Sequence, residues 1–340
     1  MAFATDTNFL QRWSAETTVA FLRNLTIGRR VNRTWDAEVM NAEKVSVQNP
    51  NYNVSVTTPS RKAVWGTPNE PGATKIDIDM DQIARVENML WVEDEVENVV
   101  RDYRSRLQTV SMSSIAKAYE DNLVAYMLAL TASSKAADNG NAGGIVEIAQ
   151  AGGNSVGFQP TSGKPFGTAA QQAEAQQWII DFLTDSKVML NRADVPQQDA
   201  AGSVIGGNAG GNFWCYMPVE LYAYGLAPWL EAKGLSLDFT AQVIQNVGVF
   251  GSAFAGNLRG FDLFVTNALP RAATKAASWN MLAGTDAAVA APMRAVRNYI
   301  TEPQNASAER FEFRHTVTYG RQLINSKLLI RAKFNAADGT

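Results

Sequence analysis

Residues 93–130, EDEVENVVRDYRSRLQTVSMSSIAKAYEDNLVAYMLAL, place apolar side chains every three or four positions, which is the spacing of one helix face. The residues on this face are Val99, Tyr103, Leu107, Val110, Ile115, Tyr119, Leu123, Tyr126 and Leu130. Three acidic residues, Glu93, Asp94 and Glu95, precede the run, where they complement the positive end of a helix dipole. The pattern predicts a spine helix of roughly 50 Å, at about 1.5 Å per residue.

The chain before this helix changes to the alternating pattern of strands. Residues 9–25 still indicate a short amphipathic helix, but residues 44–56 and 76–80 alternate apolar and polar side chains. Asn49-Pro50-Asn51 indicates a turn, and residues 57–74 are rich in proline, glycine, threonine and asparagine. Within that stretch we expect exposed side chains at Arg61, Lys62 and Trp65. We therefore predict a long two-stranded excursion with these residues near its tip.

After the long helix, the sequence predicts a second helix and several short strands. Residues 168–190 have a helical pattern. Residues 213–217 are a continuous apolar run of the kind found in buried strands, and residues 261–266 indicate a further strand. Residues 310–334 alternate well enough to form two strands. The single cysteine, Cys215, lies within an apolar run, so we interpret it as an inert core residue.

Composition narrows the class of protein. The chain has 340 residues, of which 46% are hydrophobic and 19% are charged, enough for one large core or two modest ones. No apolar run approaches the ~20 residues that cross a bilayer, and the first residues lack a signal-peptide pattern, so we expect a cytoplasmic site of action. The net charge of −3 excludes a globally basic nucleic-acid binder, although one surface could still lie beside DNA.

Candidate catalytic and metal-binding residues are few. The only histidine, His315, lies in a strand pattern without a nearby nucleophile framework, so no catalytic triad is predicted. Residues 77, 79 and 81 are aspartates whose carboxylates could bind a hard cation, but a solvated strand face has the same spacing, and we favour that interpretation. A loop at residues 157–165 has Pro165 where a phosphate-binding loop needs serine or threonine. We therefore predict no catalytic residue, no cofactor and no metal.

Five motifs follow one another along the chain. They are the arm residues Trp13, Asn32, Arg33 and Trp35; residues 76–81 with 92–95; residues 190–226 with Pro218-Val219-Glu220; residues 260–270; and Tyr319-Gly320. In this order they resemble the major capsid proteins of tailed bacteriophages, which share the Hong Kong 97 fold. Each motif is short, so the resemblance depends on their order.

The resemblance implies an α+β fold of the Hong Kong 97 type, divided into five segments. These are an N-terminal arm (1–40), an extended β-ribbon loop (41–92), a peripheral domain with the spine helix (93–195), an axial domain (196–290) and the C-terminal strands of the peripheral domain (291–340). It also implies inter-subunit contacts at the loop tip through Arg61, Lys62 and Trp65. Further site residues are the spine-helix start at Glu93, Asp94 and Glu95 and the arm residues Trp13, Asn32, Arg33 and Trp35.

The function that the resemblance implies is structural. A major capsid protein, which is not an enzyme, assembles as pentamers and hexamers into an icosahedral shell around double-stranded DNA. The implied partners are further copies of the chain, a separate scaffolding protein, a portal protein and a decoration protein, with no membrane. The shell would be assembled in the cytoplasm of a bacterial host and would become part of the virion.

Two alternatives stay open at the level of sequence. One is an encapsulin-like nanocompartment shell protein, which would enclose protein cargo instead of DNA. The other is a carboxylate-based hydrolase that uses Asp77 or Asp79. A hydrolase should elute as a small oligomer, whereas a shell subunit should sediment in megadalton particles.

Overall fold

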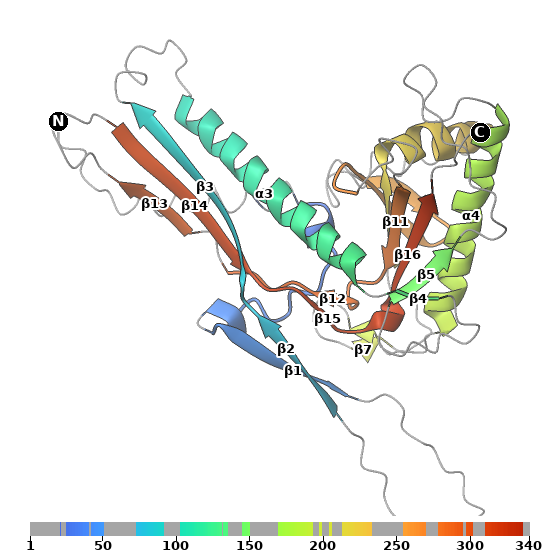
Figure 1. Cartoon of the computed structure of the whole chain (residues 1–340), viewed down its shortest axis with the longest axis horizontal. Helices are drawn as coiled ribbons and strands as arrows, with labels where there is room; N and C mark the ends of the chain where they lie inside the picture. The colour runs from blue at the N-terminus through green and yellow to red at the C-terminus, as the bar shows by residue number, and fades with distance from the viewer. Residues whose placement is uncertain are drawn as a thin grey trace, which may run out of the picture.

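The computed structural model describes the body of the chain in fifteen stretches. They are residues 21, 25–40, 42–50, 73–91, 103–130, 132–134, 145–149, 169–192, 197–198, 204–205, 213–232, 254–269, 278–294, 297–301 and 310–335. Figure 1 shows a long helix, α3, beside an elongated sheet, a compact body built on a larger sheet, and a two-stranded ribbon that projects from the region where they meet.

The compact body is built on a seven-stranded mixed sheet. In spatial order its strands are β4 (Ala132–Ser134), β5 (Ile145–Ala149), β16 (Leu329–Asn335), β11 (Ser278–Gly284), β8 (Phe213–Pro218), β10 (Phe261–Thr266) and β9 (Phe254–Leu258). Every residue of β8 is buried, and β8 pairs in parallel with β10 so that Phe213 lies opposite Phe261. Continuous apolar runs are typical of strands covered on both faces. The prediction of strands at residues 213–217 and 261–266 in the core is confirmed, and the structure shows that they are neighbours.

Helices cover this body. The helix α4 (Ala169–Arg192) packs against the π-helical turn η3 (Leu221–Leu226) and against β11. Within α4, the rings of Trp178 and Phe182 stack with centroids 5.7 Å apart. The turn η3 continues directly into α5 (Ala227–Ala232).

The long helix α3 (Tyr103–Ala129) lies along a three-stranded antiparallel sheet (Figure 1). Its 27 residues correspond to about 40 Å. The sheet has the order β13 (Arg297–Thr301), β14 (Arg310–Tyr319) and β3 (Gln82–Trp91). The predicted long helix is therefore present, whereas its expected acidic start at residues 93–95 lies outside the described residues.

The buried face of α3 differs in part from the predicted one. Its buried residues are Ser111, Met112, Ile115, Ala116, Tyr119, Glu120, Leu123, Val124 and Met127. Val110, which we expected on this face, is 63% exposed. The sheet and the N-terminal segment contact the helix from two directions, so the covered stripe is broader than a single row of residues and shifted away from Val110.

The projecting ribbon consists of β1 (Lys44–Pro50) and β2 (Ala73–Asp79), paired antiparallel. The turn that we predicted at Asn49-Pro50-Asn51 is wrong, because Asn49 pairs with Thr74 and Pro50 with Ala73. Proline is tolerated in strands that lie at an edge, and both strands of a two-stranded ribbon are edges.

Three elements pair with or pack on other parts of the molecule than the expected segment boundaries imply. The strand β3 was expected in the extended loop but pairs with β14. The helix α4 and the strand β16 were both expected in the peripheral domain, yet α4 packs on the seven-stranded body and β16 pairs with β11. Alternation identifies a strand and its faces but not its partner, which explains the difference.

Short elements complete the described chain. They are η1 (Ile27–Arg29), η2 (Glu38–Met40), η4 (Ser326–Leu328), the pair β12 (Val289–Ala290) with β15 (Gln322–Leu323), and the pair β6 (Gln197–Gln198) with β7 (Val204–Ile205). The first two of these belong to the N-terminal segment that joins the two bodies.

Candidate functional site

Among the described residues, a group of buried polar contacts lies where the N-terminal segment runs between the two bodies. We call residues 25–40 the strap. Its side chains Leu25, Ile27, Val31 and Val39 are buried, so the strap is part of the core. It contacts α3 through η1 and then runs on toward the root of the ribbon, because η2 contacts β1.

A buried carboxylate on α3 holds the first turn of the strap. The side chain of Glu120 accepts hydrogen bonds from the backbone N–H groups of Thr26, Ile27 and Gly28, at 2.9, 2.9 and 2.8 Å. Burial raises the pKa of the Glu120 carboxyl, and the three N–H donors act in the opposite direction. Donors at the start of a helical turn have no partner within the turn, so Glu120 satisfies groups that burial would otherwise leave unpaired.

Gly28 allows the strap to approach α3 closely. A Cβ atom at this position would lie 2.5 Å from Cε1 of Tyr119, whose side chain is fully buried. Tyr119 also packs edge-on against Phe21 and Tyr319, with ring centroids 6.1 and 4.6 Å away. The ring is therefore held from several sides and has little room to move.

We expect Gly28→Ala to lower the free energy of unfolding by about 1–3 kcal/mol, because the new methyl group overpacks the contact with Tyr119. Gly225→Ala is a suitable control, since a Cβ there would lie 3.0 Å from the flexible end of Ile179. Chemical denaturation of both variants measures the difference. Equal losses would contradict a specific close approach at Gly28.

The next part of the strap is held by charge. Arg30 forms an ion pair with Asp262 on β10, and a second one with Asp286, where Nη1 and Oδ2 are 3.4 Å apart. Its guanidinium also lies over the ring of Phe264, 5.5 Å from the centroid. Asn257 donates to the other oxygen of Asp262 at 3.0 Å. Arg30 thus joins the strap to the seven-stranded sheet.

We expect the stability of the junction to depend on pH through the carboxyl group of Asp286. Burial raises the pKa of this carboxyl to about 6, while Arg30 lowers it and Asp262 raises it further. Because the folded-state pKa lies above the ordinary value, the stability from this group should increase as the pH falls through about 6. We expect the free energy of unfolding to increase by less than about 1 kcal/mol when the pH falls from 7 to 5. The effect is small because 43% of the Asp286 side chain is exposed.

Thermal denaturation of Asp286→Asn at both pH values provides the test, because asparagine does not titrate. The variant should lack the part of the pH dependence that the parent owes to Asp286. If parent and variant change equally between the two pH values, this assignment is wrong.

The predicted arm residues Asn32, Arg33 and Trp35 lie in the second half of the strap and contact the same chain. The backbone N–H of Asn32 donates to Val289 at 2.9 Å, and Arg33 pairs with Asp36 at 2.6 Å. The ring of Trp35 packs against a small separate core at the root of the ribbon. That core consists of Val39, Val45, Val47, Ile78 and Ala290.

The other predicted contact residues, Trp13, Arg61, Lys62, Trp65, Glu93, Asp94 and Glu95, lie outside the described residues. Sequence reasoning missed four residues that hold the junction: Arg30, Glu120, Asp262 and Asp286. Glu120 had a detectable signal, since it interrupts the i, i+4 row of Met112, Ala116 and Val124 that the structure buries. The other three had none, because their contacts join residues more than two hundred positions apart.

The side chains of His315, Cys215 and Asp77 have surroundings typical of a protein core or of a solvated strand face. His315 and Cys215 are buried, which lowers the pKa of the imidazole and raises that of the thiol. Asp77 lies on the exposed face of the ribbon beside Ser46 and Lys44, whose hydrogen bonds lower its pKa to about 2. Among the described residues there is no cluster of three metal-ligating side chains, and no helix there is long and apolar enough to span a membrane.

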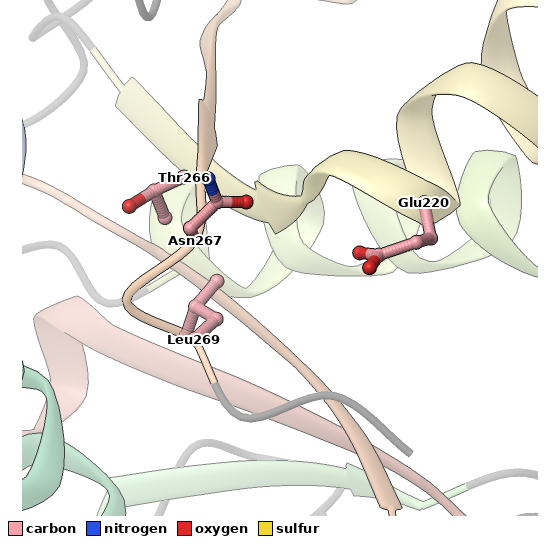
Figure 2. A pocket seen from close by; sticks show the side chains of 4 residues that line it. All are labelled: Glu220, Thr266, Asn267 and Leu269. Carbon is pink, nitrogen blue, oxygen red and sulfur yellow. The ribbon is translucent and has the colours of Figure 1, made fainter. Parts of the chain in front are cut away.

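One open pocket of about 290 Å³ lies beside the end of β10. Figure 2 shows Glu220, Thr266, Asn267 and Leu269 around it. The four lining residues offer one carboxylate, one hydroxyl and one amide, a set without histidine, cysteine or lysine. The backbone N–H of Ala268 already donates to the Thr266 hydroxyl at 3.1 Å. This set indicates no specific reaction.

The described arrangement, a long helix on a narrow sheet, a second body and a projecting ribbon, is a fold shared with chains of solved capsid structures. The chain is similar to the capsid structure of the cyanophage P-SCSP1u, with 15% sequence identity, a TM-score of 0.53 and coverage of 91% of this chain and 88% of that chain. It is also similar to the capsid of an empty GTA particle, with 13% identity, a TM-score of 0.52 and coverage of 90% and 91%.

A third similar structure is the virus-like particle from Pyrococcus furiosus, with 8% identity, a TM-score of 0.50 and coverage of 95% of this chain and 99% of that chain. No protein-family model and no curated protein matches the sequence. The likeness is therefore one of fold, and it extends over nearly the whole chain.

Proposed function

We propose that this chain is a major capsid protein of a tailed phage, which assembles as pentamers and hexamers into an icosahedral shell around double-stranded DNA. The observation that carries the proposal is the shared fold, which covers about nine tenths of this chain and of the cyanophage capsid chain. The role is structural, and no catalytic residue, cofactor or metal is part of it.

The finer organisation belongs to the same proposal. The helix α3 with the three-stranded sheet is the peripheral domain, the seven-stranded body is the axial domain, and β1 with β2 is the root of the extended loop. Arg61, Lys62 and Trp65 would then lie near the loop tip and contact a neighbouring subunit, with Glu93, Asp94 and Glu95 as an acidic surface for them. Contacts of this kind fix orientation more than affinity. Trp13 would belong to the arm that leads into the strap.

The proposed partners are further copies of the chain, a separate scaffolding protein, a portal protein and a decoration protein. The shell would be assembled in the cytoplasm of a bacterial host and located in the virion. A net charge of −3 suits an inner surface that lies near packaged DNA without binding it tightly.

The test is the assembly state of the full-length protein, measured by sedimentation and electron microscopy. We expect particles in the megadalton range, or isolated rings whose images show fivefold and sixfold symmetry. A protein that stays a monomer or dimer at all concentrations, with or without phage proteins expressed beside it, would contradict a shell-forming role.

A nanocompartment shell protein is the second candidate, supported by the likeness to the virus-like particle from Pyrococcus furiosus over 95% of this chain. The two candidates differ in what the shell encloses. Nuclease-protected double-stranded DNA inside purified particles supports the phage capsid, whereas enclosed protein without DNA supports the nanocompartment.

A further inference from the structure

The root of the ribbon is held from both sides by residues that come much later in the chain. At the entry to β1, the guanidinium of Arg294 donates from Nε to the Val39 carbonyl at 2.9 Å and from Nη2 to the Ala42 carbonyl at 2.8 Å. These two carbonyls lie shortly before the first ribbon strand, which begins at Lys44. One planar side chain therefore holds the entry at two points, which a single ammonium group would not reproduce.

The exit from β2 is held by Gly320. A Cβ atom on this residue would lie 2.7 Å from the carbonyl oxygen of Asp79 and 2.9 Å from Cγ2 of Ile78. The ribbon backbone therefore passes directly over this glycine. The backbone N–H of Gly320 donates to Pro292 at 3.0 Å, which links the exit to the segment that carries Arg294.

The two supports form one unit. The backbone N–H of Arg294 donates to Thr318 at 2.9 Å, and Met293 and Tyr319 form an isolated bridge. The backbone N–H of Met293 also donates to Asp36 of the strap at 3.0 Å. We call Arg294 and Gly320 the root socket. Arg294 lies shortly before β13, and Gly320 directly follows β14. The root socket therefore connects the ribbon to the three-stranded sheet.

We propose that Arg294 is a positioning residue for assembly, which sets the direction in which the ribbon leaves the three-stranded sheet and thereby the geometry of contacts between subunits. The assembly part of this inference rests on the proposed capsid function. The socket itself does not, because it is a property of the single subunit. The contacts of Arg294 go to partly buried carbonyls that water can also satisfy, so its loss should loosen the ribbon without unfolding the body.

The first test measures the ribbon direction in the free subunit. Spin labels are placed at Lys75→Cys on β2 and Tyr299→Cys on β13, both in exposed positions, while the fully buried Cys215 should not react. With Arg294 intact we expect a narrow distribution of label distances. Arg294→Gln should broaden it about twofold, and Arg294→Lys, which keeps the charge, should broaden it less.

The chain offers a matched control in Arg331. Its Nη1 also donates to two backbone carbonyls, those of Leu128 at 2.7 Å and Leu130 at 3.2 Å, but at the end of α3 and away from the ribbon. Arg331→Gln should leave the label distances unchanged. If Arg294→Gln also leaves them unchanged, or if both variants broaden them equally, the socket does not set the ribbon direction.

The second test compares particles by electron microscopy. Arg294→Gln should give open or unevenly sized shells under conditions in which the parent and Arg331→Gln form closed shells of one size. A loosened ribbon with normal shells would overturn the role in assembly while leaving the socket in place. If the parent forms neither particles nor rings and stays a monomer or dimer, the proposed function fails, and the distances between the spin labels still test whether Arg294 sets the ribbon direction.

Discussion

Replacing Glu120 with alanine should lower the free energy of unfolding by about 3–5 kcal/mol, the largest loss that we expect from a polar residue. The change leaves the backbone N–H groups of Thr26, Ile27 and Gly28 without their acceptor. A buried donor left unpaired costs about 1–3 kcal/mol, and the three lie next to one another. Chemical denaturation of the free subunit measures the loss.

Two further variants make the Glu120 prediction specific. Glu120→Gln keeps one acceptor oxygen and the volume, so it should cost clearly less than alanine. Asp121→Ala, the next residue, removes an exposed carboxylate that pairs with Lys117, and such surface pairs contribute about 0–1 kcal/mol. If Glu120→Ala destabilises the subunit no more than Asp121→Ala, the carboxylate does not hold the strap.

Phe264→Ala should lower the free energy of unfolding by a similar amount, about 3–5 kcal/mol, because it removes a large ring from a core that cannot collapse around the cavity. Phe264 is 2% exposed and stacks on Tyr216 at 5.1 Å between centroids. It also lies beneath Arg30, so the same change removes a surface on which the strap rests.

The control for Phe264 is an aromatic residue on an exposed strand. Tyr299 on β13 is 57% exposed, and Tyr299→Ala should change the free energy of unfolding by less than about 0.5 kcal/mol. Chemical denaturation compares the two variants. An unchanged stability for Phe264→Ala would mean that the core between β8 and β10 is not the centre of this body.

Both predictions concern the strap, which joins the first part of the chain to residues that follow it by more than two hundred positions. The Glu120 carboxylate and the Arg30 guanidinium are polar groups at buried positions, and each finds its partner only across the junction. Polar groups of this kind stabilise one arrangement of two bodies, because any other arrangement leaves them unpaired. We therefore expect mutations in the strap to alter how the two bodies sit together.

Sequence reasoning predicted the candidate site only in part. It pointed to Asn32, Arg33 and Trp35, which do lie in the strap, because aromatic and polar residues followed a recognisable order. It did not find Arg294 or Asp286, because an arginine or aspartate in a loop has no pattern of its own. The contacts that hold the ribbon join segments around residues 39–42, 292–294 and 318–320. Spacing within one local stretch of sequence cannot predict contacts between distant segments.

The amino-acid sequence by itself determined the elements whose pattern is local. The apolar run at residues 213–217, the strand at 261–266, the helix at 168–190 and the alternation around Asp77 all follow from which side chains must leave water. Only the tertiary structure decided which strand pairs with which, that β16 joins β11 and β3 joins β14, and which stripe of α3 is covered. The physical reason is that burial selects a face of an element, whereas the partner for that face is selected by the shape and charge of distant segments.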